Sequence, residues 1–157
     1  MLDEAAARAV RALAGRSVTT AESLTAGYVS AALGSVAGVS AVLRGGVVAY
    51  TPQAKRDLLG VDAALLAAHG TVHPEVARQM ARGARTLLRS ETAVATTGVA
   101  GPGPAEGHPA GTAFICVALA DRATVRALNL QGGRESVRTQ CALAALQLLA
   151  EVAEQNT

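Results

Sequence analysis

The chain has 157 residues and a net charge of +2, and half of its residues are apolar although only 2% are aromatic. This length suffices for one hydrophobic core, so we predict a single domain over residues 1–157 with a core of Ala, Val and Leu. The charge gives no electrostatic case for nucleic acid as the principal partner. No apolar run approaches the ~20 residues of a membrane span, and the acidic start Asp3-Glu4 does not fit a secretory signal. We therefore expect a cytoplasmic protein that does not enter a membrane.

Hydrophobic spacing and the positions of Gly and Pro divide the chain into alternating helices and strands. In the first half we predict a helix over 2–13, a strand over 17–21, a helix ending near Leu33, a strand over 42–50, and short helices from Pro52 and Asp62. In the second half we predict a long helix from Pro74, a buried strand over 93–97, a Gly/Pro-rich loop over 98–109, a hairpin of strands over 112–120 and 124–130, and a final helix. Gly45-Gly46 predicts a bulge or a close backbone approach. The fold class is α/β, a three-layer α/β/α sandwich around a mixed sheet of about five strands.

The cysteines and the single lysine bear on the redox state of the chain and on the choice of a catalytic base. Cys116 and Cys141 lie far apart among apolar neighbours, so we expect reduced, buried side chains and no disulfide. Among the 14 basic residues, Lys55 is the only lysine. Arg cannot serve as a base at physiological pH, whereas a desolvated Lys can. A solitary Lys can also be an accident of composition, so the residues around Lys55 must decide whether it has a functional role.

Two residues indicate nucleophilic catalysis. Ser23 follows a predicted strand and begins a helix, where free amides can stabilise developing negative charge. The alternative is that Ser23 or Thr25 only caps the helix. Lys55 follows another strand and reaches the Ser23 hydroxyl as its base if the two strands are neighbours. Tyr50 either assists this pair or is a half-buried strand aromatic.

Two further segments suit an anionic or amide ligand. Thr96-Thr97-Gly98 runs into the Gly-rich loop, whose backbone amides can approach a phosphate or carboxamide oxygen, although it matches no phosphate-binding fingerprint. Arg134 and Arg138 lie one turn apart at the start of the last helix, which suits a phosphate, with surface ion pairs as the alternative. The three histidines show no ligand spacing, so we expect neither a metal nor another cofactor.

Six sequence blocks, each unspecific alone, together resemble the CinA carboxy-terminal domain family. They are AESLTAG at 21–27, GGVVAY at 45–50, AK at 54–55 with LGV at 59–61, TGVAGP at 97–102, PAG at 109–111 and GRESVR at 133–138. The resemblance covers almost the whole chain, in order. It implies an amidase of the nicotinamide-nucleotide type, which hydrolyses nicotinamide mononucleotide to nicotinic acid mononucleotide and ammonia in pyridine-nucleotide recycling.

By position, the resemblance implies that Ser23 is the nucleophile, Lys55 its base and Tyr50 an assisting group. The substrate-binding set that it implies is Thr25, Gly27, Gly46, Thr96, Thr97, Gly98, Gly101, Arg134 and Arg138, with Arg138 near the phosphate.

Three positions and one loop depart from the usual family pattern, and the loop is Pro104-Ala105-Glu106, which replaces a plainer glycine run. Leu24 replaces a common Cys, which is tolerated if the side chain only packs. Ala26 replaces a common Gly and would add a methyl beside the oxyanion site. His73 replaces Ser before Pro74 and would weaken a helix cap.

The alternative from another class is a non-catalytic nucleotide-binding module that regulates a partner in competence or the DNA-damage response. A pure binder would not need both Ser23 and Lys55, so their presence together favours the enzyme. In either case the expected partner is a small pyridine nucleotide, and the Ala-rich terminal helices are compatible with a homo-oligomer.

Overall fold

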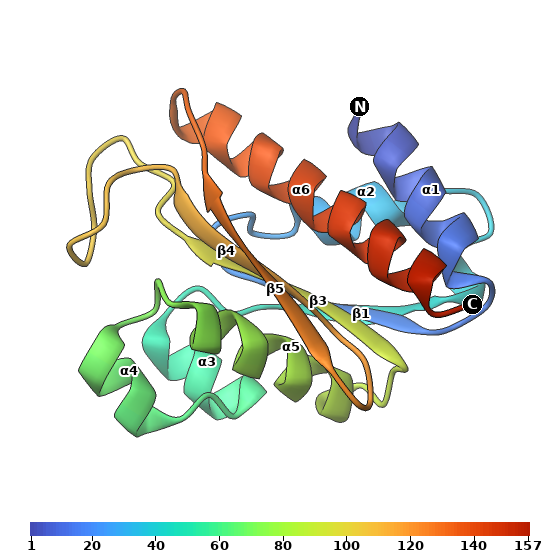
Figure 1. The fold of residues 1–157 in the computed structure, drawn as a ribbon, viewed down its shortest axis with the longest axis horizontal. Helices are drawn as coiled ribbons and strands as arrows, with labels where there is room; N and C mark the ends of the chain where they lie inside the picture. The colour runs from blue at the N-terminus through green and yellow to red at the C-terminus, as the bar shows by residue number, and fades with distance from the viewer.

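The computed structural model describes all residues 1–157 as a five-stranded mixed sheet between two layers of helices (Figure 1). The strands are β1 (Val18–Glu22), β2 (Leu43–Val48), β3 (Thr92–Gly98), β4 (Thr112–Ala118) and β5 (Ala123–Asn129). They follow the order β2-β1-β3-β4-β5, with β1 parallel to β2 and β3, and β4 antiparallel to β3 and β5. The predicted three-layer α/β/α fold is confirmed.

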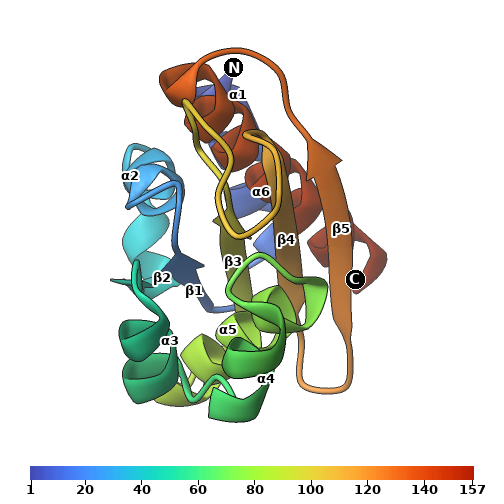
Figure 2. The same ribbon diagram turned by 90° about the vertical axis from the view of Figure 1, so that its left-hand side faces the viewer.

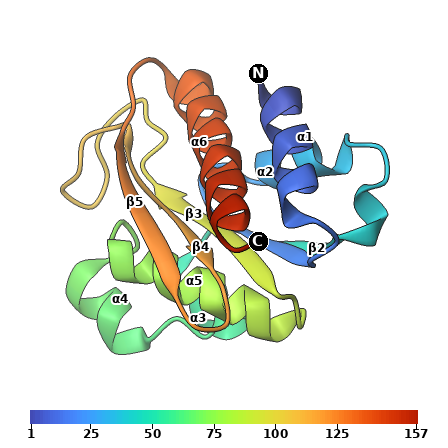
Figure 3. The same cartoon turned by 45° about the vertical axis from the view of Figure 1, so that its right-hand side comes forward.

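Helices cover both faces of this sheet. On one face lie α1 (Leu2–Leu13), α2 (Tyr28–Gly34) and α6 (Arg134–Gln155), and on the other lie α3 (Pro52–Leu59), α4 (Ala63–His69) and α5 (Pro74–Leu87) (Figures 1 and 3). Successive side chains of a strand point to opposite faces. Val94 therefore packs in the core with α1, α2 and α6, whereas Ala93 and Ala95 pack in the core with α5. β3 lies in the middle of the sheet, and six of its seven residues are buried, the three threonines included.

Two strands end two residues earlier than the sequence predicts, and the other strand ends agree with the prediction to within one residue. β2 ends at Val48, and after one more backbone bond to β1, from Ala49 N to Glu22 O at 2.9 Å, the chain turns into α3. Tyr50 thus follows the strand and does not lie in it. β4 ends at Ala118, so residues 119–122 form the hairpin connection. A short 3-10 helix over Val39–Ala41 was not predicted.

A bulge lies directly before the predicted position Gly45-Gly46, because β2 carries one extra residue, Arg44, between the partners of Val18 and Thr19. Gly46 also allows a close approach, since a Cβ there would collide with the hydroxyl oxygens of Thr20 and Ser30. Packing against β1 and α2 therefore requires glycine at 46, whereas Gly45 has a φ of 151°, a conformation that favours glycine.

His73 caps α5, contrary to the expected weak cap. Its ring Nδ1 accepts a hydrogen bond from the backbone N of Glu75 at 3.1 Å. The imidazole thus takes the place of a serine hydroxyl at the helix start. Pro74 occupies the first turn, where its missing N–H costs nothing.

Both cysteines are buried and unpaired, as predicted. Burial raises the pKa of Cys116 and of Cys141 to about 12, which keeps both thiols protonated. The helices include none with the length and apolar character to cross a membrane.

Candidate active site

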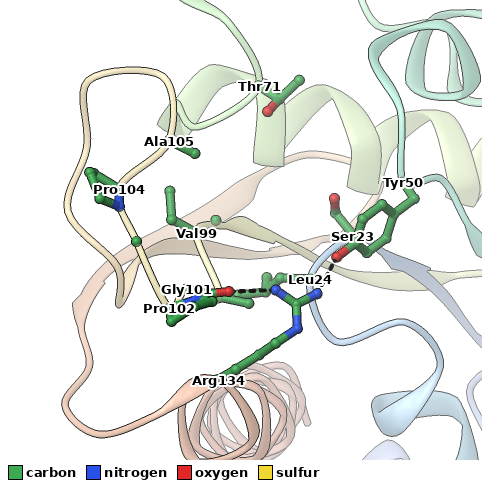
Figure 4. A pocket seen from close by; sticks show the side chains of 13 residues that line it. Ser23, Leu24, Tyr50, Thr71, Val99, Gly101, Pro102, Pro104, Ala105 and Arg134 are labelled. Atoms are coloured by element: carbon green, nitrogen blue, oxygen red, sulfur yellow. Dashed lines mark hydrogen bonds between the residues drawn. The ribbon is translucent and has the colours of Figure 1, made fainter.

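A cavity of about 330 Å³ lies where β1 and β3 end, and its walls come from segments far apart in the chain. The turn after β1, the loop between β3 and β4, and the start of α6 meet at this end of the sheet (Figures 1 and 2). Five residues predicted from the sequence line the cavity: Ser23, Tyr50, Gly98, Gly101 and Arg134 (Figure 4). The carboxyl ends of parallel strands are where α/β proteins usually bind ligands.

The structure brings Lys55 and Ser23 together. Lys55 Nζ donates to Ser23 Oγ at 2.8 Å, and also to the carbonyl oxygens of Ala49 at 2.9 Å and Tyr50 at 3.4 Å. These three acceptors hold the amine directly behind the serine hydroxyl. The Ser/Lys pair predicted from the sequence therefore has the geometry that proton transfer requires.

Local sequence explains how Lys55 reaches Ser23. β1 and β2 are parallel neighbours, so the turns that follow them start side by side. Thr51 caps α3 by accepting from the backbone N of Ala54 at 3.1 Å, and Pro52 occupies the first turn. Lys55 thus lies on the first turn of α3 and extends toward the end of β1.

Burial sets the charge state of the amine. The Lys55 side chain is only 1% exposed, and this burial lowers its pKa from 10.5 to about 8, with the carboxylate of Glu106 acting in the opposite direction. No acidic side chain forms an ion pair with the ammonium. A usable fraction of the amine is therefore neutral near neutral pH, as a general base must be.

The turn after β1 supplies backbone amides as well as the Ser23 hydroxyl. The N–H of Ser23 donates to Thr96 O at 3.1 Å and to Thr96 Oγ1 at 3.2 Å. The next N–H, that of Leu24, has no acceptor within the protein, and Leu24 lines the cavity. Ala100 and Gly101 in the facing loop also line the cavity and have N–H groups without protein acceptors. Such amides can stabilise an oxyanion that forms beside Ser23.

Arg134 bridges the mouth of the cavity. Its guanidinium donates to Gly101 O at 2.6 Å and to the Tyr50 hydroxyl at 2.9 Å (Figure 4). The Tyr50 hydroxyl therefore bonds to Arg134 and to neither Ser23 nor Lys55. Only the main-chain carbonyl of Tyr50 contacts the Lys55 amine, so Tyr50 contributes its ring to the cavity wall.

Six of the expected substrate-binding residues do not line the cavity: Thr25, Gly27, Gly46, Thr96, Thr97 and Arg138. The three threonines are buried, and their hydroxyl groups bond to protein atoms. Thr97, for example, donates to Thr71 O at 2.8 Å and so holds the connection between α4 and α5. Gly27 begins α2 with a φ of 105°, a conformation that favours glycine.

Arg138 holds the backbone of the turn that follows Ser23. Its guanidinium donates to Leu24 O at 2.9 Å and to Thr25 O at 3.4 Å, and it stacks on the Tyr28 ring at 4.2 Å. One face of the guanidinium is thus covered, and its side chain is 19% exposed. Arg138 therefore lies behind the turn that follows Ser23, and Arg134 lies at the cavity.

Sequence reasoning missed two acidic residues beside the site. Glu22 ends the fully buried strand β1, and its carboxylate accepts hydrogen bonds from the start of α2. Glu106 is the only acidic residue of the Gly/Pro-rich loop, and it accepts from the backbone N of Thr71 at 2.8 Å. The sequence signal for Glu22 was an acidic residue directly after a predicted strand, and that for Glu106 was a single acidic residue in a Gly/Pro-rich loop.

Ala26 has a different consequence from the one expected. The residue is exposed and does not line the cavity, but its φ of 46° lies in the left-handed region. That conformation costs an L-residue roughly 1–2 kcal/mol relative to glycine. The departure from the family glycine thus affects backbone strain rather than the oxyanion site.

We expect Ala26→Gly to raise the free energy of unfolding by about 1 kcal/mol, after the added freedom of the unfolded glycine is subtracted. Ala14→Gly is the matched control, since Ala14 is exposed with a φ of 50° at the end of α1, far from the site. Urea unfolding should show similar gains for both variants. A loss of stability on Ala26→Gly, with the gain present at Ala14, would refute the assignment of strain.

The fold and this site define an α/β protein with a buried Ser/Lys pair at the carboxyl end of a mixed sheet. The chain belongs to the CinA family, because the family model described as the CinA C-terminal domain matches residues 2–153. A CinA-like protein of Mycolicibacterium gilvum is 51% identical over 141 residues, which cover 87% of this chain and 33% of that protein. The chain thus spans about a third of the length of the curated relatives that it matches.

Solved structures of the family have the same fold. A competence-damaged protein (CinA) superfamily protein from Klebsiella pneumoniae superposes with a TM-score of 0.95 and 34% identity, covering 99% of both chains. The competence/damage inducible protein CihA from Agrobacterium tumefaciens superposes with a TM-score of 0.91 and 37% identity, covering 96% of this chain and 94% of that chain. The family and the fold indicated by the six sequence blocks are confirmed.

Proposed function

We propose that this domain is an amidase that hydrolyses nicotinamide mononucleotide to nicotinic acid mononucleotide and ammonia. The observation that carries the proposal is the 2.8 Å hydrogen bond between the buried Lys55 amine and the Ser23 hydroxyl at the cavity. A serine hydroxyl is a weak nucleophile, and a neutral amine beside it is one of the known ways to activate it. The 330 Å³ cavity lies within the usual size range for small-molecule sites.

The reaction can be written with these groups. Ser23 Oγ attacks the carboxamide carbon while its proton passes to Lys55, and the carbonyl oxygen becomes an oxyanion that accepts from the Leu24 N–H. Lys55 then returns the proton to the amide nitrogen, the C–N bond breaks, and ammonia leaves an ester on Ser23. Water, deprotonated by Lys55, hydrolyses this ester and regenerates the hydroxyl. No metal ion takes part in these steps.

We propose Arg134 as the residue that binds the substrate phosphate. It lines the cavity, and its guanidinium uses only two of its five N–H donors, on Gly101 and Tyr50. The sequence resemblance implied this role for Arg138, whose guanidinium instead holds the carbonyl groups of Leu24 and Thr25. Arg134 is therefore the better placed of the two for an anion.

Arg134→Ala should weaken apparent affinity for nicotinamide mononucleotide about ten- to a hundred-fold, the effect of one lost charge-assisted hydrogen bond. The loss should be much smaller for nicotinamide riboside, which lacks the phosphate. Arg138→Ala is the control, and because it loosens the turn it should affect both substrates equally. If Arg134→Ala weakened affinity equally for both substrates, and Arg138→Ala weakened it only for the phosphorylated one, Arg138 and not Arg134 would be the residue that binds the phosphate.

Ammonia release from nicotinamide mononucleotide by the purified protein tests the function itself. We expect one ammonia for each nicotinic acid mononucleotide formed. Calorimetry in parallel separates the enzyme from the alternative, a non-catalytic nucleotide-binding module. Nucleotide binding by folded protein without any ammonia release would favour that module and refute the amidase.

A further inference from the structure

The carboxylate of Glu22 is completely buried and forms no ion pair. It accepts four hydrogen bonds instead. Oε1 accepts from Thr25 Oγ1 at 2.7 Å and Val29 N at 2.8 Å, and Oε2 accepts from Ser30 N at 3.0 Å and Ser30 Oγ at 2.7 Å. Burying a carboxylate is costly unless every oxygen is satisfied, and here each oxygen receives one amide and one hydroxyl hydrogen.

A chain of hydrogen bonds through the hydroxyl groups of Thr25 and Thr96 reaches one oxygen of the Glu22 carboxylate, and the donor of each bond in it can be assigned. A carboxylate can only accept, so the single hydroxyl hydrogen of Thr25 is used on Glu22. The 2.8 Å bond between the hydroxyl oxygens of Thr25 and Thr96 must therefore be donated by Thr96. Thr96 Oγ1 in turn accepts from the backbone N of Ser23 at 3.2 Å. The N–H of Ser23 is thus connected to the Glu22 carboxylate through two threonines.

A second chain reaches the other carboxylate oxygen. Ser30 donates its hydroxyl hydrogen to Glu22, so the short bond between Ser30 and Thr20 must be donated by Thr20. Gly46 on β2 leaves room for this pair, because a Cβ there would collide with both hydroxyl oxygens. Glu22 therefore joins β1, β3 and the start of α2, the segments that surround the nucleophile.

We infer that Glu22 is a positioning residue that fixes Ser23 against Lys55 through the directed chain of Thr25 and Thr96. The inference rests on the proposed function to the extent that Ser23 is taken as the nucleophile. Ser23 directly follows Glu22, and its amide is the end of the chain. A misplacement of about 1 Å at a reacting group can lower the rate about a hundred-fold. Loss of the hydrogen bonds between Glu22 and the Ser23 turn should therefore lower the rate.

Glu22→Gln tests whether positioning needs the carboxylate charge, because Gln has almost the same shape as Glu but no charge. The amide nitrogen brings two hydrogens to a position where a backbone N–H and a hydroxyl already donate. The hydroxyl can keep a hydrogen bond only by reversing its direction, and the backbone N–H of Val29 or Ser30 loses its acceptor whichever way the side chain turns. We expect kcat for nicotinamide mononucleotide to fall about ten- to a hundred-fold, with KM changed by less than about threefold. Rates are measured well below the thermal transition of each variant, so that unfolding does not contribute.

A double variant tests whether Glu22 acts on Ser23 through Thr25, because the losses of kcat should then not add. Thr25→Val removes the hydroxyl link and should lose kcat as Glu22→Gln does, whereas Thr25→Ser keeps the hydroxyl and should restore most of it. The double variant Glu22→Gln/Thr25→Val should lose no more than the worse single variant, because both break one chain. Thr19→Val is the matched control, since Thr19 is buried on β1 but its hydroxyl has no hydrogen-bond partner. That variant should leave kcat unchanged.

A second readout separates this inference from the substrate assignment. A fluorophosphonate probe labels an activated serine, as the Ser23 Oγ–P bond forms, fluoride leaves and the proton passes to Lys55. If the wild type labels at Ser23 but releases no ammonia from nicotinamide mononucleotide, the proposed substrate fails and the variants are ranked by labelling rate instead. Wild-type rates for Glu22→Gln, or fully additive losses in the double variant, would overturn the inference. A wild-type Ser23 that neither labels nor hydrolyses would overturn both proposals.

Discussion

Ser23→Ala should reduce hydrolysis of nicotinamide mononucleotide by about a thousand-fold or more, because the nucleophile supplies the covalent step and nothing else near the amine can replace it. The Ser23 hydroxyl is the only side-chain group that bonds to the Lys55 amine, and the other two acceptors are main-chain carbonyls. Single-turnover kinetics measure the loss without interference from product release.

The same variant should still fold and bind. Removing the hydroxyl leaves the backbone bonds of Ser23 to Thr96 in place. Calorimetry with nicotinamide mononucleotide should therefore give a dissociation constant within about fivefold of the wild type, a difference of about 1 kcal/mol. Substantial turnover by a folded Ser23→Ala protein would show that water is activated directly and that no ester forms on Ser23.

Lys55→Arg should lower hydrolysis about a hundred-fold or more, the scale of a lost general base. Arg keeps the positive charge and much of the length but cannot give up its proton, so this variant separates proton transfer from electrostatic placement. Lys55→Met complements it, because Met has a similar volume, no charge and no base. Both variants should lose activity to a similar extent while nucleotide binding changes much less.

Stability supplies the control for the Lys55 variants. Burial of the ammonium lowers its pKa, so the charged form is disfavoured in the folded protein. Lys55→Met removes this cost but also leaves the carbonyl oxygens of Ala49 and Tyr50 without the amine hydrogens, so the two effects oppose each other and the thermal transition should change little. Lys55→Arg instead buries a larger cation. An inactive but stable Lys55→Met protein would exclude unfolding as the cause. Near-normal hydrolysis by folded Lys55→Arg would refute the Ser/Lys mechanism even if the protein proved to be an amidase.

The secondary structure could be predicted because it depends on local patterns. The helix of residues 2–13, the bulge beside Gly45-Gly46 and the hairpin of β4 and β5 each follow from hydrophobic spacing or from turn residues. The Ser23 and Lys55 pairing needed one more fact, that β1 and β2 are parallel neighbours. Sequence reasoning stated this as a condition, and the structure satisfies it.

The roles of individual polar residues could not be predicted in the same way. Thr25 and Thr96 stand in the same motifs as Ser23 and the glycine loop, but their hydroxyls point into the protein and bond to each other. Arg134 and Arg138 are one helical turn apart, and only the packing of α6 over the Ser23 turn decides which one reaches the cavity. Side-chain direction depends on tertiary packing, which one sequence does not reveal.

The most direct test of the Ser/Lys amidase is the pH dependence of single-turnover hydrolysis of nicotinamide mononucleotide by the wild type. Only the neutral amine can accept the Ser23 proton, and burial lowers the pKa of Lys55 to about 8. The rate should therefore rise about tenfold per pH unit below an apparent pKa near 8 and level off above it. Absence of ammonia release at every pH, or a rate that does not change from about pH 6 to about pH 9.5, would contradict the Ser23 and Lys55 mechanism.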